Sequence, residues 1–133
     1  MTTSCACGNR IDTHHHIIPP AYLARARDRV IADAPAHARN MLEWNAARAV
    51  EELDRVGIAT AITSISSPGI WFGDRDTTRM LSRECNDFAA RIKQDHPGRF
   101  GQFATLPLPD VDASLREIEY ALGDLKAEGI GLV

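Results

Sequence analysis

The sequence predicts an α/β protein built on a parallel sheet of about four strands. Short apolar segments rich in β-branched residues alternate with longer amphipathic segments, in the order β-α-β-α-β-α-β. The joints from helix to strand are minimal, whereas the joints from strand to helix are longer. Strands joined through helices in this way run parallel, with right-handed crossovers. In such folds function gathers at the carboxyl ends of the strands, where the long loops lie.

The first part of the chain predicts one strand and two helices. Residues 10–17 are short, bounded and extended, and a long irregular segment with one short helix over Tyr22–Arg29 follows them. Residues 45–57 predict the next helix, with Asn45 as its N-cap and Gly57 as its C-terminal stop. Five apolar residues share one face of that helix, namely Ala46, Ala49, Val50, Leu53 and Val56.

The rest of the chain predicts three strands and two helices. Residues 58–66 read as a strand that is apolar on both faces, residues 99–109 as the next strand, and residues 129–133 as the start of a fourth. Residues 76–98 predict a helix with an apolar face made of Leu81, Cys85, Phe88, Ala89 and Ile92. Residues 114–129 predict a helix with an apolar face made of Leu115, Ile118, Leu122 and Leu125.

Two kinds of signal mark the helix starts. Ser114 and Glu117 have the spacing of a capping box, which predicts that the last helix begins at Ser114. The acidic residues of GDRD and LPDVD are typical of helix starts, where the helix dipole favours negative charge. We therefore interpret these acids as helix-start residues rather than as paired catalytic carboxylates.

Composition and charge exclude several classes of protein. The chain has 133 residues, 44% of them hydrophobic, and a net charge of -3, and its basic residues form no stripe that would bind nucleic acid. No apolar run approaches the roughly 18 residues of a membrane-spanning helix. Residues 1–9 are expected to form a flexible tail that carries Cys5 and Cys7. Three cysteines without a disulfide framework, Cys85 among them within a helical pattern, favour a reducing cytoplasm.

Three consecutive histidines stand at the end of the first predicted strand, in RIDTHHHIIPP. Because side chains alternate along a strand, Asp12, His14 and His16 are expected on one face. Two imidazoles at this spacing can tilt to about 2.0–2.1 Å from one Zn²⁺ ion, so His14 and His16 are candidate metal ligands. Asp12 is expected to orient one ligand, and His15, on the other face, to hydrogen-bond near the first helix. The alternative is a polar strand end with solvated histidines.

The segment SSPGIWFGD, at the end of the second predicted strand, supplies candidate substrate contacts. Trp71 and Phe72 are candidates for an apolar wall beside an aromatic or unsaturated acid, and Ser67 for a hydrogen bond to it. The alternatives are a loop that packs its own aromatic residues and a serine that only ends the strand.

Four segments carry a wider pattern, in the order DTHHHIIPPAY, ELDRVGIATAITSISSPGIWFGD, RECNDFAA and DHPGRFGQFATLPLPDVDASLREIEYAL. From Arg10 to Val133 this pattern resembles the amidohydrolase superfamily. Within it, the chain is similar to the decarboxylase-like branch, which includes aminocarboxymuconate-semialdehyde, resorcylate and 6-methylsalicylate decarboxylases.

The resemblance implies a (β/α)₈ barrel with a divalent ion, usually Zn²⁺, on the positions that match His14 and His16. It also implies a histidine ligand from the fifth strand, an acid/base histidine near the sixth and an aspartate from the eighth, all expected beyond Val133. Since a complete barrel takes about 250 residues, we expect residues 10–133 to form an incomplete domain, the N-terminal half of a TIM barrel with open sheet edges.

Three hypotheses about function follow. The first is a carboxy-lyase, a metal-dependent non-oxidative decarboxylase of a small aromatic or unsaturated carboxylic acid, which needs no redox cofactor. The second is a metal-dependent hydrolase of a lactone or an amide on the same scaffold. The third is a metal-binding fragment without catalysis. We expect a small carboxylic acid as partner and neither nucleic acid nor membrane, and homo-oligomerisation is left open.

Overall fold

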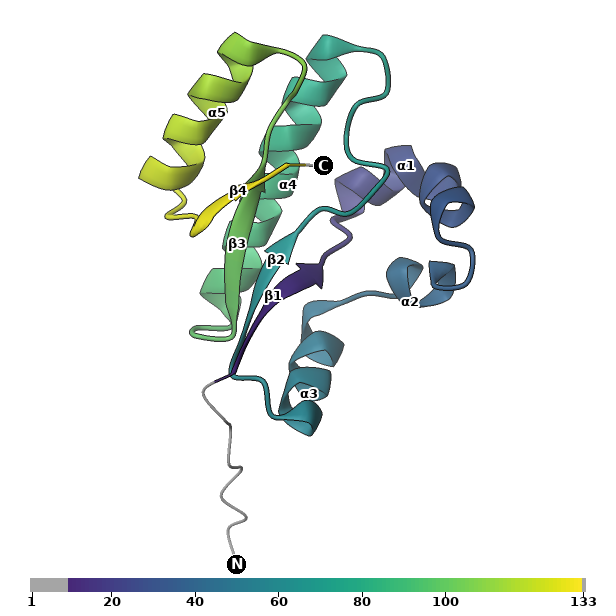
Figure 1. Cartoon of the computed structure of the whole chain (residues 1–133), viewed down its shortest axis with the longest axis vertical. Coiled ribbons are helices and arrows are strands. Elements are labelled where there is room, and N and C mark those ends of the chain that lie inside the picture. The colour runs from purple at the N-terminus through teal and green to yellow at the C-terminus, as the bar shows by residue number, and fades with distance from the viewer. Residues whose placement is uncertain (1–9, 133) are drawn as a thin grey trace, which may run out of the picture.

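A computed structural model describes residues 10–132, so that the tail expected over residues 1–9 lies outside the described part. Four strands form one sheet in the order β1-β2-β3-β4, and every neighbouring pair is parallel (Figure 1). The elements are β1 (Ile11–His16), α1 (Pro20–Asp33), α2 (Ala38–Leu42), α3 (Ala46–Val56), β2 (Thr60–Ser64), α4 (Arg75–Asp95), β3 (Phe100–Thr105), α5 (Val111–Gly123) and β4 (Gly129–Gly131). The α/β class and the parallel sheet predicted from the sequence are confirmed.

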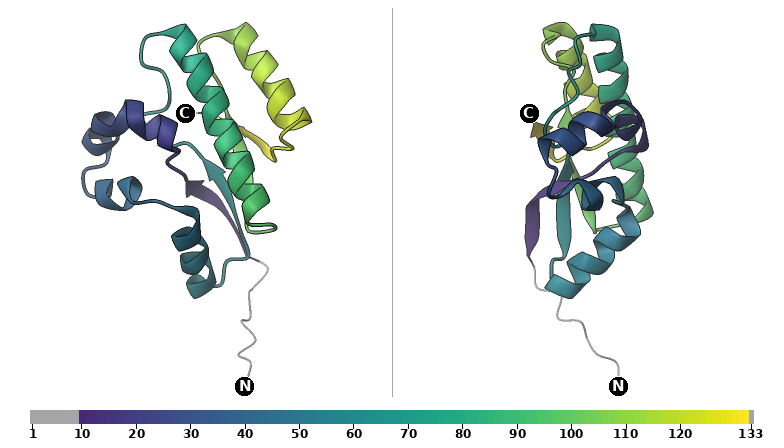
Figure 2. Two further views of the ribbon diagram at one scale, coloured as in Figure 1. Left: turned by 180° about the vertical axis from the view of Figure 1, so that it is seen from behind. Right: turned by 90° about the vertical axis from the view of Figure 1, so that its right-hand side faces the viewer.

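The helices lie along one face of the sheet, and α4 runs along its middle (Figure 2). On β3, the buried Gln102 points to this helix, because its Nε2 donates to the backbone oxygen of Asn86 over 3.0 Å. Side chains alternate along a strand, so the next residue, Phe103, faces away from α4. We call the side of the sheet that carries Phe103 the inner face.

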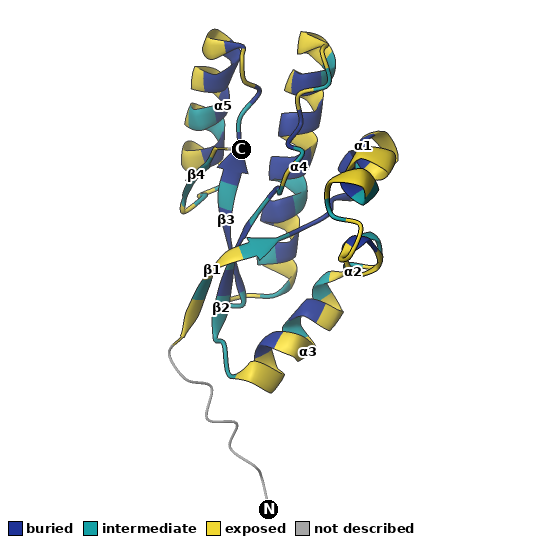
Figure 3. Cartoon of the chain, turned by 45° about the vertical axis from the view of Figure 1, so that its right-hand side comes forward, coloured by how far each residue is buried: buried dark blue, intermediate teal, exposed yellow. Residues whose placement is uncertain are grey.

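The hydrophobic core fills the space between the sheet and its helices (Figure 3). It draws on the strands β2 and β3, on the helices α1, α3 and α4 and on the loops beside them, and it includes Tyr22, Ala26, Val30, Leu53, Ala61, Ile65, Leu81, Cys85, Ala89, Ile92 and Phe100. Within the described residues, no helix combines the length and the apolar character that crossing a membrane requires.

The N-terminal helices differ from the sequence prediction. The helix expected over Tyr22–Arg29 extends over Pro20–Asp33, because Pro20 at its first turn presets a helical φ without losing a hydrogen bond. A second short helix, Ala38–Leu42, lies in the segment that was expected to be irregular. Tyr22, Ala26 and Val30 recur at four-residue spacing on the buried face of α1. This spacing in the sequence indicates a helix that continues beyond Arg29.

The caps of α3 and α4 follow the sequence closely. The Asn45 side chain accepts from the backbone N–H of Arg48 over 3.0 Å, and Gly57 ends α3 with a φ of 69°. Asp74 caps α4 by accepting from the backbone N–H of Thr77 over 2.7 Å. These local contacts fix both helices. Val56, which the sequence places on the apolar face of α3, is exposed at its last turn.

Helix α5 begins three residues earlier than expected, at Val111. Its cap is Asp110, whose Oδ1 accepts from the backbone N–H of Ala113 over 3.0 Å. The predicted capping box is wrong, because Ser114 Oγ donates to the backbone oxygen of Asp110 and Glu117 accepts from side chains of α4. Of the predicted apolar face, Leu115 and Leu122 are exposed, and Ile118 and Leu125 are half-buried. The residues of α5 that are buried instead are Ala113, Ser114, Glu117 and Ala121.

Candidate metal centre

His14 and His16 stand together at the carboxyl end of β1. Their ring centroids lie 4.7 Å apart in an edge-to-face arrangement with an interplanar angle of 75°. Nδ1 of His16 lies 3.1 Å from Oγ of Ser64, the residue paired with it on β2. This hydrogen bond occupies Nδ1 and leaves Nε2 of His16 as the nitrogen that can bind another group.

The surroundings of His16 favour the neutral imidazole, which is the form that binds metal ions. Burial is the main cause that lowers the pKa of His16 below its ordinary value of 6.5, and the neighbouring His14 lowers it further. Hydrogen bonding at Ser64 acts in the opposite direction and does not outweigh burial. At neutral pH the side chain of His16 is therefore available as a ligand without first losing a proton.

A bulge changes the alternation that the sequence predicted for β1. Asp12 pairs with Ala61 and His15 with Thr63, so three steps along β1 match two steps along β2. As a result, the carboxylate of Asp12 approaches His15, with 3.5 Å between Oδ2 and Nδ1. Oδ1 of Asp12 also accepts from the backbone N–H of His14 over 3.0 Å. Asp12 therefore contacts the backbone of the histidine pair rather than either of its rings.

His15 points away from the pair, but not to the first helix. Its ring lies beside Trp44, at 6.5 Å between centroids, and beside Phe100, at 6.2 Å. Nε2 of His15 is buried without a hydrogen-bond partner, so the expected bond near α1 is absent. Burial lowers the pKa of His15, and the nearby charge of Asp12 opposes this shift.

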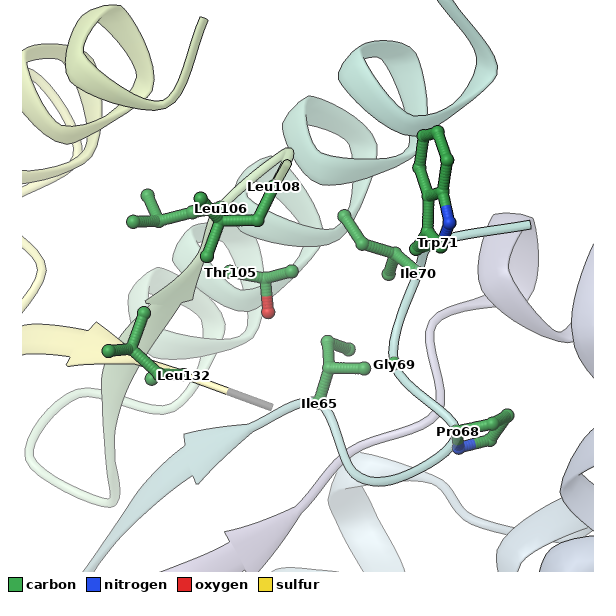
Figure 4. A pocket seen from close by; sticks show the side chains of 10 residues that line it. Ile65, Pro68, Gly69, Ile70, Trp71, Thr105, Leu106, Leu108 and Leu132 are labelled. Atoms are coloured by element: carbon green, nitrogen blue, oxygen red, sulfur yellow. The ribbon is translucent and has the colours of Figure 1, made fainter. Parts of the chain in front are cut away.

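The three candidate substrate residues occupy different surroundings. Trp71 lines a pocket at the carboxyl ends of β2, β3 and β4 (Figure 4). Phe72 instead packs toward α1, where the guanidinium of Arg29 lies 4.6 Å from its ring centroid. Ser67 is not among the residues that line the pocket, although Pro68 is. Of the three, Trp71 lines this pocket, whereas Ser67 and Phe72 do not.

The histidine pair supplies half of a typical metal site. Within residues 10–132, no group of three or more histidine, cysteine, aspartate or glutamate side chains comes together to hold an ion. A four-coordinate ion on His14 and His16 would take its other ligands from elsewhere. Sequence reasoning missed Ser64, which holds His16 in place; the signal was its position at the end of the second predicted strand, level with the histidines.

Comparison with known proteins adds a family to this geometry. The sequence profile of the amidohydrolase family matches residues 11–133. The decarboxylase yanB of Aspergillus niger is 36% identical over 129 residues, which are 93% of this chain and 34% of the relative. The 6-methylsalicylic acid decarboxylase of Penicillium expansum is 37% identical over 92% of this chain and 38% of the relative. The chain thus spans little more than a third of the length of these relatives.

Solved structures match the fold over similar shares. A dihydroxybenzoic acid decarboxylase from Polaromonas sp. JS666, crystallised with manganese and 2-nitroresorcinol, gives a TM-score of 0.77 at 28% identity and covers 92% of this chain and 37% of that one. A 5-carboxyvanillate decarboxylase from Novosphingobium aromaticivorans, also crystallised with manganese, gives 0.79 at 28% identity over 98% of this chain and 44% of that one. The parallel sheet and its helices correspond to part of a (β/α)₈ barrel, and the chain belongs to the amidohydrolase family.

Proposed function

We propose that this chain carries part of the active site of a metal-dependent, non-oxidative decarboxylase of small aromatic carboxylic acids. One observation carries the proposal: an amidohydrolase-family chain holds two imidazoles, His14 and His16, 4.7 Å apart between ring centroids at the carboxyl end of β1. It is supported by relatives named as decarboxylases of 6-methylsalicylic acid and of gamma-resorcylate.

The proposed metal ligands are His14 and His16. The fit is supported by the bond between His16 and Ser64, which leaves one ring nitrogen of His16 free, and by the lowered pKa of His16. Manganese in related decarboxylases supports a divalent ion, and Zn²⁺, the ion expected from the sequence, remains the other candidate. When bound, such an ion supplies positive charge that polarises a carboxylate or holds it in place.

The side chains around the pair have positioning roles in this proposal. Ser64 fixes the ring of His16, and Asp12 holds the backbone of His14. Decarboxylation replaces the C–CO₂ bond by a C–H bond, so one proton is delivered to carbon and no electrons are exchanged with a redox cofactor. The acid that gives this proton, like the remaining ligands, has to come from residues other than those assigned here.

A second candidate function is metal binding without catalysis. It is favoured by one observation, since only two ligand side chains come together within residues 10–132. The hydrolase hypothesis has no such specific observation, because the relatives and solved structures described above are named as decarboxylases.

Release of CO₂ separates these functions. Because the proton donor and the remaining ligands lie outside the residues assigned here, we would supply the rest of the barrel of a related decarboxylase as a second polypeptide. We would incubate this mixture with Mn²⁺ or Zn²⁺ and with 6-methylsalicylate or 2,6-dihydroxybenzoate, and measure CO₂ together with loss of the acid. We expect turnover that is lost in His14→Ala and kept in His37→Ala, a control at an exposed histidine. Metal binding through His14 without CO₂ release would favour the second candidate, and cleavage of a lactone without CO₂ release would favour a hydrolase.

We also propose a cytoplasmic location. It is supported by the cysteine content, because three cysteines in 133 residues form no disulfide framework in the sequence. A small aromatic carboxylic acid is the proposed partner.

A further inference from the structure

A small, partly open pocket lies where β2, β3 and β4 end (Figure 4). The space that it encloses is small, about 60 Å³, which is room for an alkyl substituent or the edge of an aromatic ring rather than for a whole aromatic acid. The wall is formed by Ile65, Pro68, Gly69, Ile70, Trp71, Thr105, Leu106, Leu108, Gly131 and Leu132.

Because the wall is mainly apolar, the pocket is suited to an uncharged part of a ligand. The Thr105 hydroxyl and the Trp71 indole N–H are the polar side-chain groups among the lining residues, and none of these residues is charged. Trp71 is 42% exposed and Leu108 is 41% exposed, so both present large apolar surfaces to an entering molecule. An indole beside aliphatic side chains suits a flat aromatic ring or its alkyl substituent, whereas a carboxylate would find no positive partner there.

The pocket is connected to the histidine pair through Ser64 and Gly131. A methyl group placed on Gly131 would lie 3.9 Å from Cβ of Ser64 and 3.5 Å from Cβ of Phe103, which puts all three on the inner face of the sheet. Ser64 in turn bonds His16 over 3.1 Å. An aromatic acid with one edge of its ring in the pocket can therefore direct its carboxylate past Ser64 toward the histidines.

We infer that this pocket holds the apolar edge and alkyl substituent of the aromatic acid, and that Leu108 and Gly131 set which substituents are accepted. The inference rests on the proposed function and extends it to the choice of substrate. The absence of a side chain at Gly131 leaves room between the pocket and Ser64, and the half-exposed Leu108 forms another part of the wall.

Fluorescence of Trp71 reports on the pocket directly. The chain has two tryptophans, Trp44 and Trp71, and Trp44→Phe leaves Trp71 as the single reporter. We would titrate this variant with benzoate and with 2-methylbenzoate. We expect both acids to change the emission, and 2-methylbenzoate to bind about fourfold more tightly, because its methyl group is removed from water. Equal affinities, or no change in emission with either acid, would overturn the inference.

Two matched pairs of variants locate the binding. Leu108→Glu places a charge in the wall, and Leu115→Glu makes the same change at an exposed leucine of α5 away from the pocket. Gly131→Ala adds a methyl group beside Ser64, and Gly123→Ala adds one where no atom lies within 4 Å. We expect 2-methylbenzoate to bind at least tenfold more weakly to Leu108→Glu and several-fold more weakly to Gly131→Ala.

The two control variants are expected to bind 2-methylbenzoate as the parent does, and equal weakening in both members of a pair would contradict the assignment. Mn²⁺ titration of the same proteins separates this inference from the proposed function. Mn²⁺ binding with no response of Trp71 to the acids would overturn the pocket alone. A Trp71 response that follows the two pairs, without Mn²⁺ binding, would leave the pocket and remove the metal-dependent function.

Discussion

The centre of the molecule and its margins are built differently. In the centre, α4 packs on β3, and Leu81 on its inward face is completely buried. At one margin, α5 turns Leu115 outward with 56% of its surface exposed, and β4 pairs on one edge only. At the other margin, β1 carries the histidine pair, and its residues are exposed or half-buried. We therefore expect the buried contacts of α4 to contribute most to the free energy of unfolding, whereas the candidate metal ligands lie on β1 at the margin.

The same amphipathic pattern has different outcomes in the two regions. The apolar faces of α4 and α5 look alike in the sequence, but only that of α4 meets the sheet. Helix α5 packs inward through small residues and the buried Glu117, and its leucines form an outward stripe. An amphipathic pattern therefore identifies a helix without identifying what covers its apolar face.

The largest effect is expected at the centre. Leu81→Ala leaves a cavity between α4 and the sheet, which should lower the free energy of unfolding by about 3 kcal/mol. Met80→Ala, at the exposed neighbour on the same helix, should cost about 0.5 kcal/mol or less. Urea unfolding of both variants measures the difference. Similar losses in the two would mean that the centre is not the stable part of the fold.

The next largest change in the free energy of unfolding is expected at the contact between α4 and Glu117 of α5. Glu117 accepts from Arg83 and from Asn86, each over 2.8 Å, and is itself buried. Glu117→Ala leaves Asn86 short of a partner but returns the half-exposed Arg83 to water, so a loss of about 2 kcal/mol is expected. Exposed Glu119→Ala on the same helix is the control for chemical denaturation. Equal stability of the two variants would contradict the role of Glu117.

At the β1 margin, stability should depend on pH. Burial lowers the pKa of His15 and His16 below 6.5, so the unfolded chain binds more protons than the folded chain at mildly acidic pH. Their contribution is therefore unfavourable to folding below about pH 6.5 and vanishes above it. The free energy of unfolding should fall between pH 7.5 and 5.5, and fall less in His15→Gln/His16→Gln than in His37→Gln. The same slope in both variants would exclude these two histidines as its source.

The smallest effect is expected on the stripe of α5. Leu115→Ser and Leu122→Ser remove leucines that are already exposed, so each should change the free energy of unfolding by about 0.5 kcal/mol or less. Thermal unfolding at two protein concentrations provides the measurement. A large loss, or a melting temperature that rises with concentration only in the parent, would mean that another surface covers the stripe.

Much of the fold could be predicted because its signals are local. The Asn45 cap, the Gly57 stop and the Asp74 cap act within a few residues of themselves, and the buried face of α4 repeats regularly. The start and inward face of α5 could not be predicted, because the burial of Glu117 depends on Arg83, which belongs to another helix. The sequence carries no sign of that contact.

In the candidate metal centre, too, features with a local signal could be predicted from the sequence, and features that depend on pairing between strands could not. Spacing was enough to predict that the rings of His14 and His16 lie together and that His15 points elsewhere, whereas their role as metal ligands is a proposal. Strict alternation did not reveal the bulge after Asp12, which brings that carboxylate to His15. Ser64 could be recognised only once β2 was set in register with β1.

Binding of Mn²⁺ to the histidine pair is the most direct test of the central claim. Mn²⁺ suits the experiment because thiolates bind it poorly, so Cys5 and Cys7 will not compete with the imidazoles. Calorimetric titration of the whole chain should show one ion per chain for the parent and for His37→Ala. Affinity should fall at least tenfold in His14→Ala/His16→Ala. Unchanged binding by that double variant would show that the pair at the end of β1 is not a metal site.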